Sequence, residues 1–301
     1  MLHYLNQLGK SAEVIVPNNY PKFLKWMPGN DEVKIYENDR EAGDVLIAKA
    51  DLIFSLDYNI LSRTFDMSDS LEKSSADFIL IDHHQNPADY PTVTFSDTTS
   101  CSTCQLVYDF IEYSGHLELI NDDIAQAIYC GIMTDSGSFR FSSVNDRTHL
   151  IAGRLIASGL DHAYIHGQVY DTNVLDRLKL VGHALSNKLE IIDGSHTALI
   201  YLDRSELETY NYRPGDTEGL VNYALSMEGI NLAAFIREGN NEVKMSFRSK
   251  GHFDVNQFAR TYFNGGGHIN AAGASSGASL EDVISKFKSA VSQHSQELNF
   301  G

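Results

Sequence analysis

The side chains best suited to chemistry stand directly after two apolar runs of the chain. The triplet Asp82-His83-His84 follows residues 77–81, and Asp57 follows residues 52–56. A third carboxylate, Asp135, closes a helical pattern and leads into a small-residue turn. Carboxylates with one or two imidazoles suit hard divalent cations such as manganese, iron and magnesium. A strand-terminal Asp alone is often only a cap, and a His pair is often only hydrogen-bonded, so a metal site requires these residues to converge.

Convergence requires that these residues leave neighbouring elements at one edge of a sheet. The runs 13–17, 51–56 and 77–81 have the continuous apolar character of strands in a parallel sheet covered on both faces. Helical patterns at 40–49 and 62–73 lie between them, as βαβ units require. Ligands of such sheets bind beyond the carboxyl ends of the strands, where Asp57 and the triplet fall.

Helical periodicity then dominates from about 102 to 189. The helix expected at 122–135 carries Asp135 on its apolar face, and further helices are expected at 102–114 and between 146 and 189. Beyond them the sequence predicts strands and turns, followed by a helix at 254–263, a glycine loop at 265–267 and a terminal helix at 279–297. The expected strands are 189–192, 197–202, 231–237 and 242–248.

The expected fold is therefore α/β with two domains. A parallel sheet with flanking helices occupies residues 1–172, and a helical linker covers 173–188. A smaller α/β domain with a mixed sheet occupies residues 189–298. The chain length of 301 residues agrees with about two domains.

Composition limits the classes of partner. Asp and Glu number 40 against 23 Lys and Arg, which gives a net charge of −17 and argues against a surface that tracks long nucleic acid. No apolar run approaches the roughly 18 residues of a membrane span. Three cysteines and an N-terminus without signal-peptide character favour a reducing, cytoplasmic location.

The order of these motifs resembles the Asp-His-His (DHH) phosphoesterase superfamily. Asp57, then Asp82-His83-His84, then Asp135 occur in that family's order, and the later residues resemble its DHH-associated C-terminal domain. The later residues are Phe247-Arg248-Ser249, the segment 254–263 and Gly265-Gly266-Gly267-His268. In size and layout the chain is most similar to the group of oligoribonucleases (nanoRNases) and 3′-phosphoadenosine 5′-phosphate phosphatases.

The resemblance implies roles for the first-half residues. Asp57 corresponds to a carboxylate that bridges two metal ions, and His83 and Asp135 to ligands of the second ion. His84 corresponds to a group that contacts the substrate phosphate, and Asp82 to a residue that orients the histidines. The implied cofactor is two Mn²⁺ ions, with Mg²⁺ or Co²⁺ as alternatives, and the implied reaction is attack on phosphorus by a metal-activated water.

The resemblance also implies that the second domain holds the substrate. Arg248 and Ser249 on a strand, the three glycines at 265–267 and His268 correspond to groups that bind a nucleotide. Gly265 also fits a helix C-cap, which would explain one glycine without a ligand. The implied substrates are short RNA oligonucleotides and adenosine 3′,5′-bisphosphate, and a homodimer is left open.

One family motif is not found. The family begins with a strand followed by a His and an Asp-x-Asp motif, whereas this sequence opens at Met1-Leu2-His3-Tyr4. The hypothesis that follows is a native protein longer by a few dozen residues. Three other functions stay open: a cyclic-dinucleotide phosphodiesterase, a pyrophosphatase-like enzyme, and a catalytically silent protein that binds nucleotides or RNA ends.

Two smaller motifs have ordinary explanations beside functional ones. The pair Cys101 and Cys104 has the CxxC spacing, but capping and packing are favoured over a redox role because no second pair completes a zinc site. The segment Phe139-Arg140-Phe141 fits either base stacking or a half-buried strand.

Overall fold

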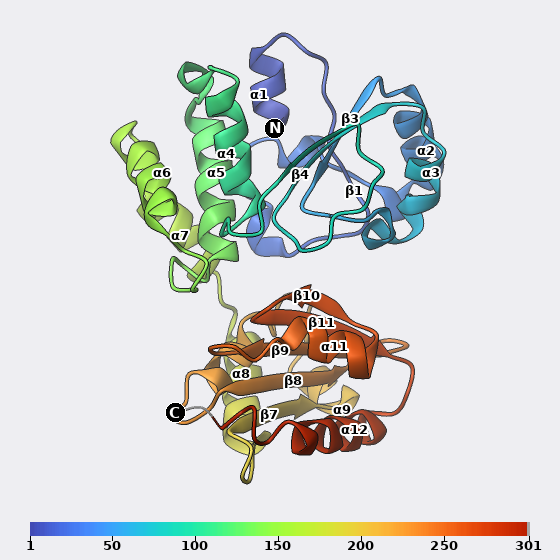
Figure 1. Ribbon diagram of the computed structural model, residues 1–301, viewed down its shortest axis with the longest axis vertical. Coiled ribbons are helices and arrows are strands. Elements are labelled where there is room, and N and C mark those ends of the chain that lie inside the picture. Colours follow the sequence, from blue (N-terminus) through green and yellow to red (C-terminus); the bar gives the residue numbers. More distant parts are fainter. Residues whose placement is uncertain (300–301) are drawn as a thin grey trace. The chain divides into compact units, whose positions relative to one another are not determined.

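The computed structural model describes residues 1–299, which fall into two compact units. The first unit is Met1–Thr172, and the second starts at Asn173. Figure 1 shows the first in blue to green and the second in yellow to red. Each unit has its own layers of helices on a sheet, as the sequence predicted for an α/β protein.

The first unit is built on a parallel sheet in the order β3-β4-β5. Its strands are β3 (Leu52–Leu56), β4 (Asp77–Asp82) and β5 (Val93–Ser96), and a separate small sheet pairs β1 (Ile15–Val16) with β2 (Lys34–Ile35). The helices are α1 (Leu2–Gln7), α2 (Arg40–Lys49), α3 (Ser68–Glu72), α4 (Thr103–Tyr113), α5 (Asp122–Asp135), α6 (Asp146–Ala157) and α7 (His162–Tyr170). Short 3-10 turns are η1 (Lys22–Leu24), η2 (Asn30–Glu32), η3 (Tyr36–Asn38), η4 (Leu61–Met67) and η5 (Leu117–Leu119).

Two apolar clusters cover the two faces of this sheet. On one face α4 and α5 pack on Ile81 and Phe54, and on the other α2 and α3 pack on Phe78. The same layering is visible in Figure 1, where α4 and α5 flank one side of the strands and α2 and α3 the other. Burial on both faces explains why the strand sequences are continuously apolar rather than alternating.

Several first-unit elements differ from the sequence prediction. The strand expected at 13–17 is only β1 and pairs outside the main sheet. The helix expected at 62–73 is broken at Phe65, whose φ of 52° and ψ of −129° cannot continue a helix. The strand interpretation of 139–141 is wrong, because the segment is a turn in which Phe139 stacks on His149.

The second unit contains a mixed sheet in the order β10-β11-β9-β8-β7-β6. The strands are β6 (Leu189–Ile192), β7 (Thr197–Leu202), β8 (Leu232–Glu238), β9 (Val243–Ser249), β10 (Gly266–His268) and β11 (Ala271–Ser276). Among the described strands of this sheet, β7 and β8 form the one parallel pair, and α9 (Arg204–Thr209) and α10 (Leu220–Leu225) lie in the connection between them. The helices α11 (Val255–Phe263) and α12 (Leu280–Gln293) contribute to a core on one face of the sheet.

The helix expected as a linker belongs to the second unit's core. This helix is α8 (Leu175–Asn187), and its Leu180 and Ala184 are fully buried against Ile200 of β7. Its buried face makes it a structural layer of the second unit on the side opposite α11 and α12. The glycines expected as a loop lie largely in β10, and Asn264, with φ of 52°, caps α11 in place of Gly265.

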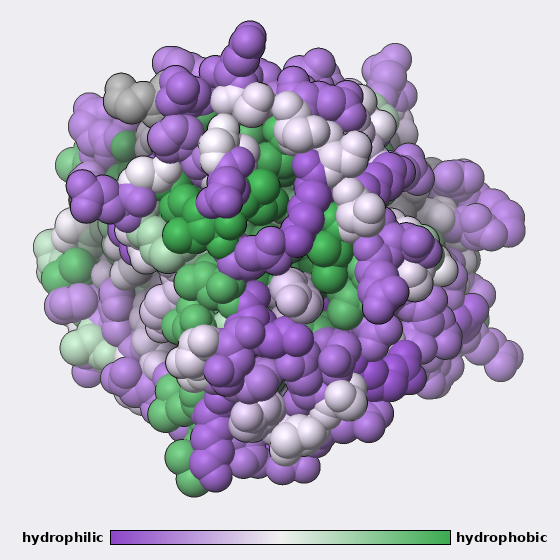
Figure 2. Space-filling view, turned by 90° about the horizontal axis from the view of Figure 1, so that it is seen from below, coloured by the Kyte–Doolittle hydropathy of each residue, from purple (hydrophilic) through white to green (hydrophobic). Residues whose placement is uncertain are grey.

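Within residues 1–299, no helix has both the length and the apolar character that crossing a membrane needs. Figure 2 shows a mostly hydrophilic face with apolar groups between polar ones. Exposed apolar side chains at this frequency are ordinary in folded proteins, so this face assigns no partner.

Candidate active site

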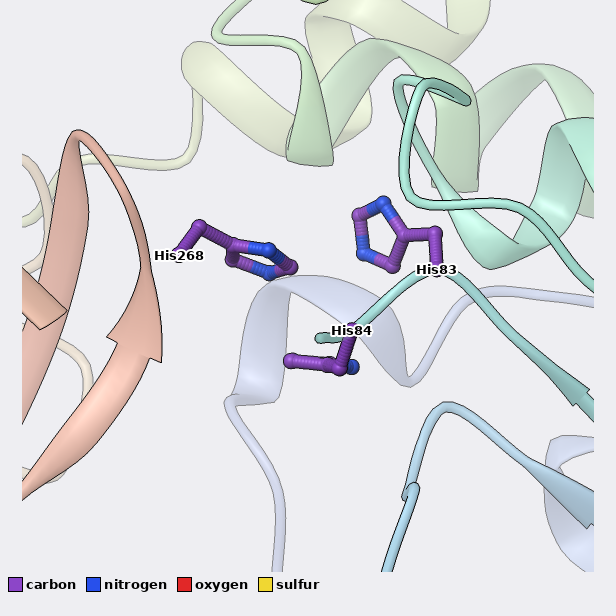
Figure 3. Close-up of side chains that lie close together, drawn as sticks. All are labelled: His83, His84 and His268. Atoms are coloured by element: carbon purple, nitrogen blue, oxygen red, sulfur yellow. The ribbon is translucent and has the colours of Figure 1, made fainter. Parts of the chain in front are cut away.

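The carboxyl ends of β3 and β4 bring the predicted residues together. Leu56 of β3 pairs with Ile81 of β4, and the N–H of Asp57 donates to the Ile81 carbonyl at 3.2 Å. Asp82 is the last residue of β4, and the rings of His83 and His84 project from the loop that follows (Figure 3). Asp57 has a φ of 67°, an uncommon value for a residue other than glycine. The sheet edge therefore places carboxylates and imidazoles side by side, as the sequence predicted.

His83 lies between two carboxylates. Its Nε2 is 3.1 Å from Asp135 Oδ2 and 3.6 Å from Asp57 Oδ1. Its Nδ1 lies 3.1 Å from the Ser100 carbonyl, which can only accept, so Nδ1 carries a proton and Nε2 faces the carboxylates. Burial disfavours the imidazolium, but the hydrogen bond and charge of Asp135, helped by Asp57, outweigh it and raise the pKa of His83 to about 8.

His84 is oriented by the buried carboxylate of Asp82. Both Asp82 oxygens lie 3.2 Å from His84 Nδ1, and Asp82 Oδ1 also accepts the backbone N–H of His84. Asp82 is completely buried, so its oxygens depend on these protein contacts rather than on water. Asp57 Oδ1 lies 3.8 Å from the same Nδ1. The contacts between Asp82 and His84 are those of a carboxylate that fixes the tautomer and direction of an imidazole.

Asp57 is held by a residue that sequence reasoning missed. Thr103, the first residue of α4, donates its hydroxyl to Asp57 Oδ1 at 2.7 Å. The pKa of Asp57 is raised, first because nearby protein atoms displace water from the carboxylate and second because Asp135 has the same charge. This holds even though 58% of the Asp57 side chain is exposed. The sequence predicts that a helix starts here, and Ser102 caps it by accepting from the Gln105 N–H. Only the packing of α4 on the sheet makes Thr103 part of the site.

Asp135 reaches the site because α5 presents one face to it. A cavity of about 300 Å³ in the first unit is lined by both Asp57 and Asp135 and by the apolar stripe of α5 that ends at Asp135. The stripe residues Ile124, Ala127, Ile128 and Gly131 match the face predicted from the periodicity. The two carboxylates thus open onto the same space.

Two sets of donors that share Asp57 have the composition of a divalent-cation site. Within residues 1–299 the ligand atoms of Asp57, Asp82 and His84 lie within 4.8 Å of one another. His83 Nε2 faces both carboxylates, at 3.1 Å from Asp135 Oδ2 and 3.6 Å from Asp57 Oδ1. A cation held between them would be bound by the imidazole and both carboxylates at once. Oxygen ligands with imidazole match manganese, iron or magnesium better than metals that prefer thiolate.

The cysteines take no part in this chemistry. Cys101, Cys104 and Cys130 are free, and burial raises the pKa of the Cys104 thiol to about 12 and that of Cys130 to about 11. A Cβ on Gly131 of α5 would lie 2.1 Å from Cys104 Sγ, so Cys104 fills the close contact between α4 and α5. The predicted packing role of the CxxC pair therefore agrees with its surroundings.

The predicted substrate residues of the second unit lie on β9 and β10, except Gly265, which precedes β10. Arg248 is half-buried, and one terminal nitrogen donates to the Phe247 carbonyl at 2.9 Å. Ser249 is buried, donates to the Phe253 carbonyl at 2.6 Å and accepts from Asn270, which gives its hydroxyl a supporting position in the loop. His268, also drawn in Figure 3, ends β10 and pairs with Ala271.

The three glycines differ in what requires them. A Cβ at Gly265 would lie 2.2 Å from the Gly273 carbonyl oxygen, and one at Gly267 would lie 2.3 Å from the Ala271 carbonyl oxygen. Both glycines are thus required by the close approach of β10 to β11. A Cβ at Gly266 would meet only side-chain atoms, the nearest at 3.7 Å. Packing therefore explains Gly265 and Gly267 but leaves Gly266 without a structural requirement.

A buried amide supports this glycine strand and was also missed. Asn256 of α11 accepts from the Gly267 N–H at 3.0 Å and from Arg260 Nε at 3.0 Å. The sequence around Asn256 predicts only a helix. It does not predict this contact, because Gly267 is 11 residues away in a different element. The contact fixes the backbone of β10 relative to α11.

Comparisons with known proteins cover both units. The DHH family, N-terminal domain, matches residues 1–132, and the DHHA1 domain matches residues 199–294. The bifunctional oligoribonuclease and PAP phosphatase NrnA of Bacillus subtilis is 31% identical over 210 residues, which are 69% of this chain and 66% of that protein. This chain therefore spans slightly less than two thirds of that relative. The Thermus thermophilus protein of the same name is 27% identical over 288 residues, covering 95% of this chain and 82% of that protein.

A solved structure matches nearly the whole chain. It is the crystal structure of an exopolyphosphatase-related protein from Bacteroides fragilis, 38% identical, with a TM-score of 0.93. The match covers 99% of this chain and 87% of that one.

Proposed function

This chain belongs to the DHH family of phosphoesterases and carries a DHHA1 domain, and from that premise we propose that it hydrolyses short RNA oligonucleotides to mononucleotides. We propose that it also removes the 3′-phosphate of adenosine 3′,5′-bisphosphate. The carrying observation is the convergence of Asp57, His83, His84 and Asp135 at one sheet edge in the first unit. Relatives named as oligoribonuclease and PAP phosphatase support the choice of substrate.

The proposed metal ligands are Asp57, His83 and Asp135, with Mn²⁺ as the ion. Bound divalent cations would supply Lewis acidity that lowers the pKa of a water and offsets phosphate charge. Ser100 holds His83 through Nδ1, which leaves Nε2 directed at the ligand carboxylates. Thr103 fixes one oxygen of Asp57, so the carboxylate keeps its direction without a ligand.

His84 is proposed to contact the substrate phosphate. The Asp82 carboxylate accepts from its Nδ1–H and fixes the direction of the ring. An imidazolium near the scissile phosphate would donate to a non-bridging oxygen and balance its charge. Asp82 is thus a positioning residue, and its completely buried carboxylate has no solvent to compete with this pairing.

Nucleotide binding is proposed for the second unit. Arg248 offers a guanidinium for a phosphate or a base, and Gly266 offers a backbone that a side chain would otherwise cover. His268 would donate to a phosphate, with Ser249 holding the strand that carries Arg248. The net charge of −17 disfavours long polyanions and so agrees with short substrates.

The test is hydrolysis of a labelled RNA dinucleotide by the 301-residue chain, with Mn²⁺ and then with a chelator. Mononucleotide release that stops with the chelator and in His83→Ala supports the proposal. Parallel reactions with adenosine 3′,5′-bisphosphate, a cyclic dinucleotide, pyrophosphate and polyphosphate rank the substrates. Preference for pyrophosphate or polyphosphate would overturn the nucleotide assignment, and dinucleotide binding without turnover would favour a silent binding protein.

A further inference from the structure

A buried asparagine links the segments that carry the two halves of the site. Asn59 stands two residues after Asp57 and is only 5% exposed. Its side-chain Nδ2 donates to the Gln85 carbonyl at 2.6 Å and to the Asn86 carbonyl at 3.3 Å. The backbone carbonyl of Asn59 accepts from the Ala88 N–H at 2.9 Å. Asn59, in the segment that follows β3, therefore makes three hydrogen bonds with the loop that follows β4.

These contacts close a frame around the ligand residues. On the strand side the frame begins with the hydrogen bond from Asp57 N–H to the Ile81 carbonyl. On the far side it ends with the contacts of Asn59. Asp57 makes the first connection on one segment, and Asp82, His83 and His84 lie between the two connections on the other. The separations of 3.6 and 3.8 Å from Asp57 to the two rings are set within this frame.

The side chain makes these contacts at a cost. Within residues 1–299, Asn59 Oδ1 is buried and has no hydrogen-bond partner. A buried polar atom left unpaired destabilises the folded protein, whereas an apolar side chain of the same shape would avoid that loss. Burial alone therefore does not account for an amide here. The two N–H donors are the feature that an apolar residue cannot supply.

The accepting loop also needs an external constraint. Asn86 has a φ of 58°, in the left-handed region, so the loop reverses sharply just after His84. That reversal turns the carbonyls of Gln85 and Asn86 toward the β3 side, where Nδ2 meets both. Without these donors, the two carbonyl oxygens would lose their partner on the β3 side, and nothing in these contacts would hold the loop against Asp57.

We propose that Asn59 is a positioning residue that fixes the distance between Asp57 and the Asp-His-His triplet and so preorganises the site for its cation. The proposal rests on the proposed metal-dependent function. Asn59 does not touch the cation or substrate. It acts on the ligands through the backbone, as outer contacts of metal ligands do, and loss of such contacts typically lowers metal affinity about 10–100-fold.

The test uses Asn59→Leu with Thr64→Val as a matched control. Leucine approximates the amide's shape without donors, and Thr64, also buried, makes its hydroxyl hydrogen bond to Leu61 within its own turn. Mn²⁺ binding to the full chain is followed by the electron paramagnetic resonance signal of free Mn²⁺. We expect the dissociation constant to rise about 10–100-fold in Asn59→Leu and to stay within about threefold in Thr64→Val.

A second measurement uses the metal-free protein. Amide hydrogen exchange of residues 83–88 should accelerate in Asn59→Leu, while exchange in the second unit's sheet stays unchanged. Unchanged Mn²⁺ affinity together with unchanged exchange at 83–88 would overturn the proposal. If Asn59→Leu does not fold, Asn59→Ser, which keeps one donor, should give an intermediate shift in both measurements. A parent protein that binds no Mn²⁺ would refute the proposed function, and the exchange measurement would still decide the role of Asn59.

Discussion

Alanine substitutions at two neighbouring glycines should have different consequences for the stability of the fold. In Gly267→Ala the new Cβ would lie 2.3 Å from the Ala271 carbonyl oxygen and 2.7 Å from Ala272 Cα. Both atoms belong to the backbone of the paired strand and cannot rotate away. In Gly266→Ala the nearest atoms are Asn256 Oδ1 at 3.7 Å and an Arg260 terminal nitrogen at 3.8 Å, which are ordinary contact distances.

The magnitudes follow from these contacts. Relief of the Gly267→Ala overlap needs a backbone shift of about 1 Å that breaks the pairing of β10 with β11, and overpacking of this kind costs about 1–3 kcal/mol. The φ of Gly267, +154°, adds conformational strain, so we expect a loss of about 2–4 kcal/mol. Gly266→Ala meets no overlap, and reduced freedom of the unfolded chain should leave stability unchanged or raise it by up to about 1 kcal/mol.

Two assays are run on each full-length variant. Urea unfolding is monitored by circular dichroism. Binding of the RNA dinucleotide is measured separately on the folded protein, with a chelator present. We expect Gly267→Ala to lower the unfolding midpoint of the second unit. We expect Gly266→Ala to keep the parental midpoint while weakening dinucleotide binding, because its methyl group covers backbone proposed to face the nucleotide. Equal stability of Gly267→Ala and the parent would refute the packing argument, and unchanged binding by Gly266→Ala would refute a ligand-facing role for this glycine.

Three further predictions concern single groups of the site. Thr103→Val should raise the Mn²⁺ dissociation constant about 10-fold at unchanged secondary structure, because Asp57 loses its fixed hydrogen bond; unaltered metal affinity in a calorimetric titration would contradict this role. The pKa of His83 rises from 6.5 in the unfolded chain to about 8 in the folded, metal-free protein, so its stabilisation is full below pH 6.5 and disappears as pH rises through 8. Urea unfolding of metal-free protein should therefore show a loss of about 1–2 kcal/mol across this range that is absent in His83→Ala, and a pH-independent difference between the two would oppose it. His268→Ala should raise KM for the dinucleotide while leaving Mn²⁺ affinity near the parental value, and the reverse pattern would make His268 a metal-site residue.

Local periodicity was sufficient for many elements of the fold. The helices α2 and α5 have the predicted bounds of 40–49 and 122–135, because each has a side-chain cap and a repeating buried face. The strands β6 and β7 also match their predicted ranges. Such elements are encoded within the segment that forms them, so neighbouring residues carry the whole signal.

Elements without a strong local signal escaped prediction. The short strand β10 was expected as a loop because glycines disfavour strands, yet close approach to β11 requires residues without a Cβ. Phe65 breaks the helix expected at 62–73, a conformation that the pattern of apolar residues does not encode. In both cases contacts with distant segments outweigh the local preference.

The sequence by itself determined which residues could do the chemistry and at which edge they would gather. Asp57 and Asp82-His83-His84 follow apolar strands, and parallel strands end at a common edge, so their proximity followed from the pattern alone. Tertiary structure alone decided what holds them: the carbonyl of Ser100 on His83, the hydroxyl of Thr103 on Asp57 and the amide of Asn59 across the two loops. Each of these contacts joins residues 17 to 46 positions apart, and a hydrogen bond needs sub-ångström placement that no spacing within one segment specifies.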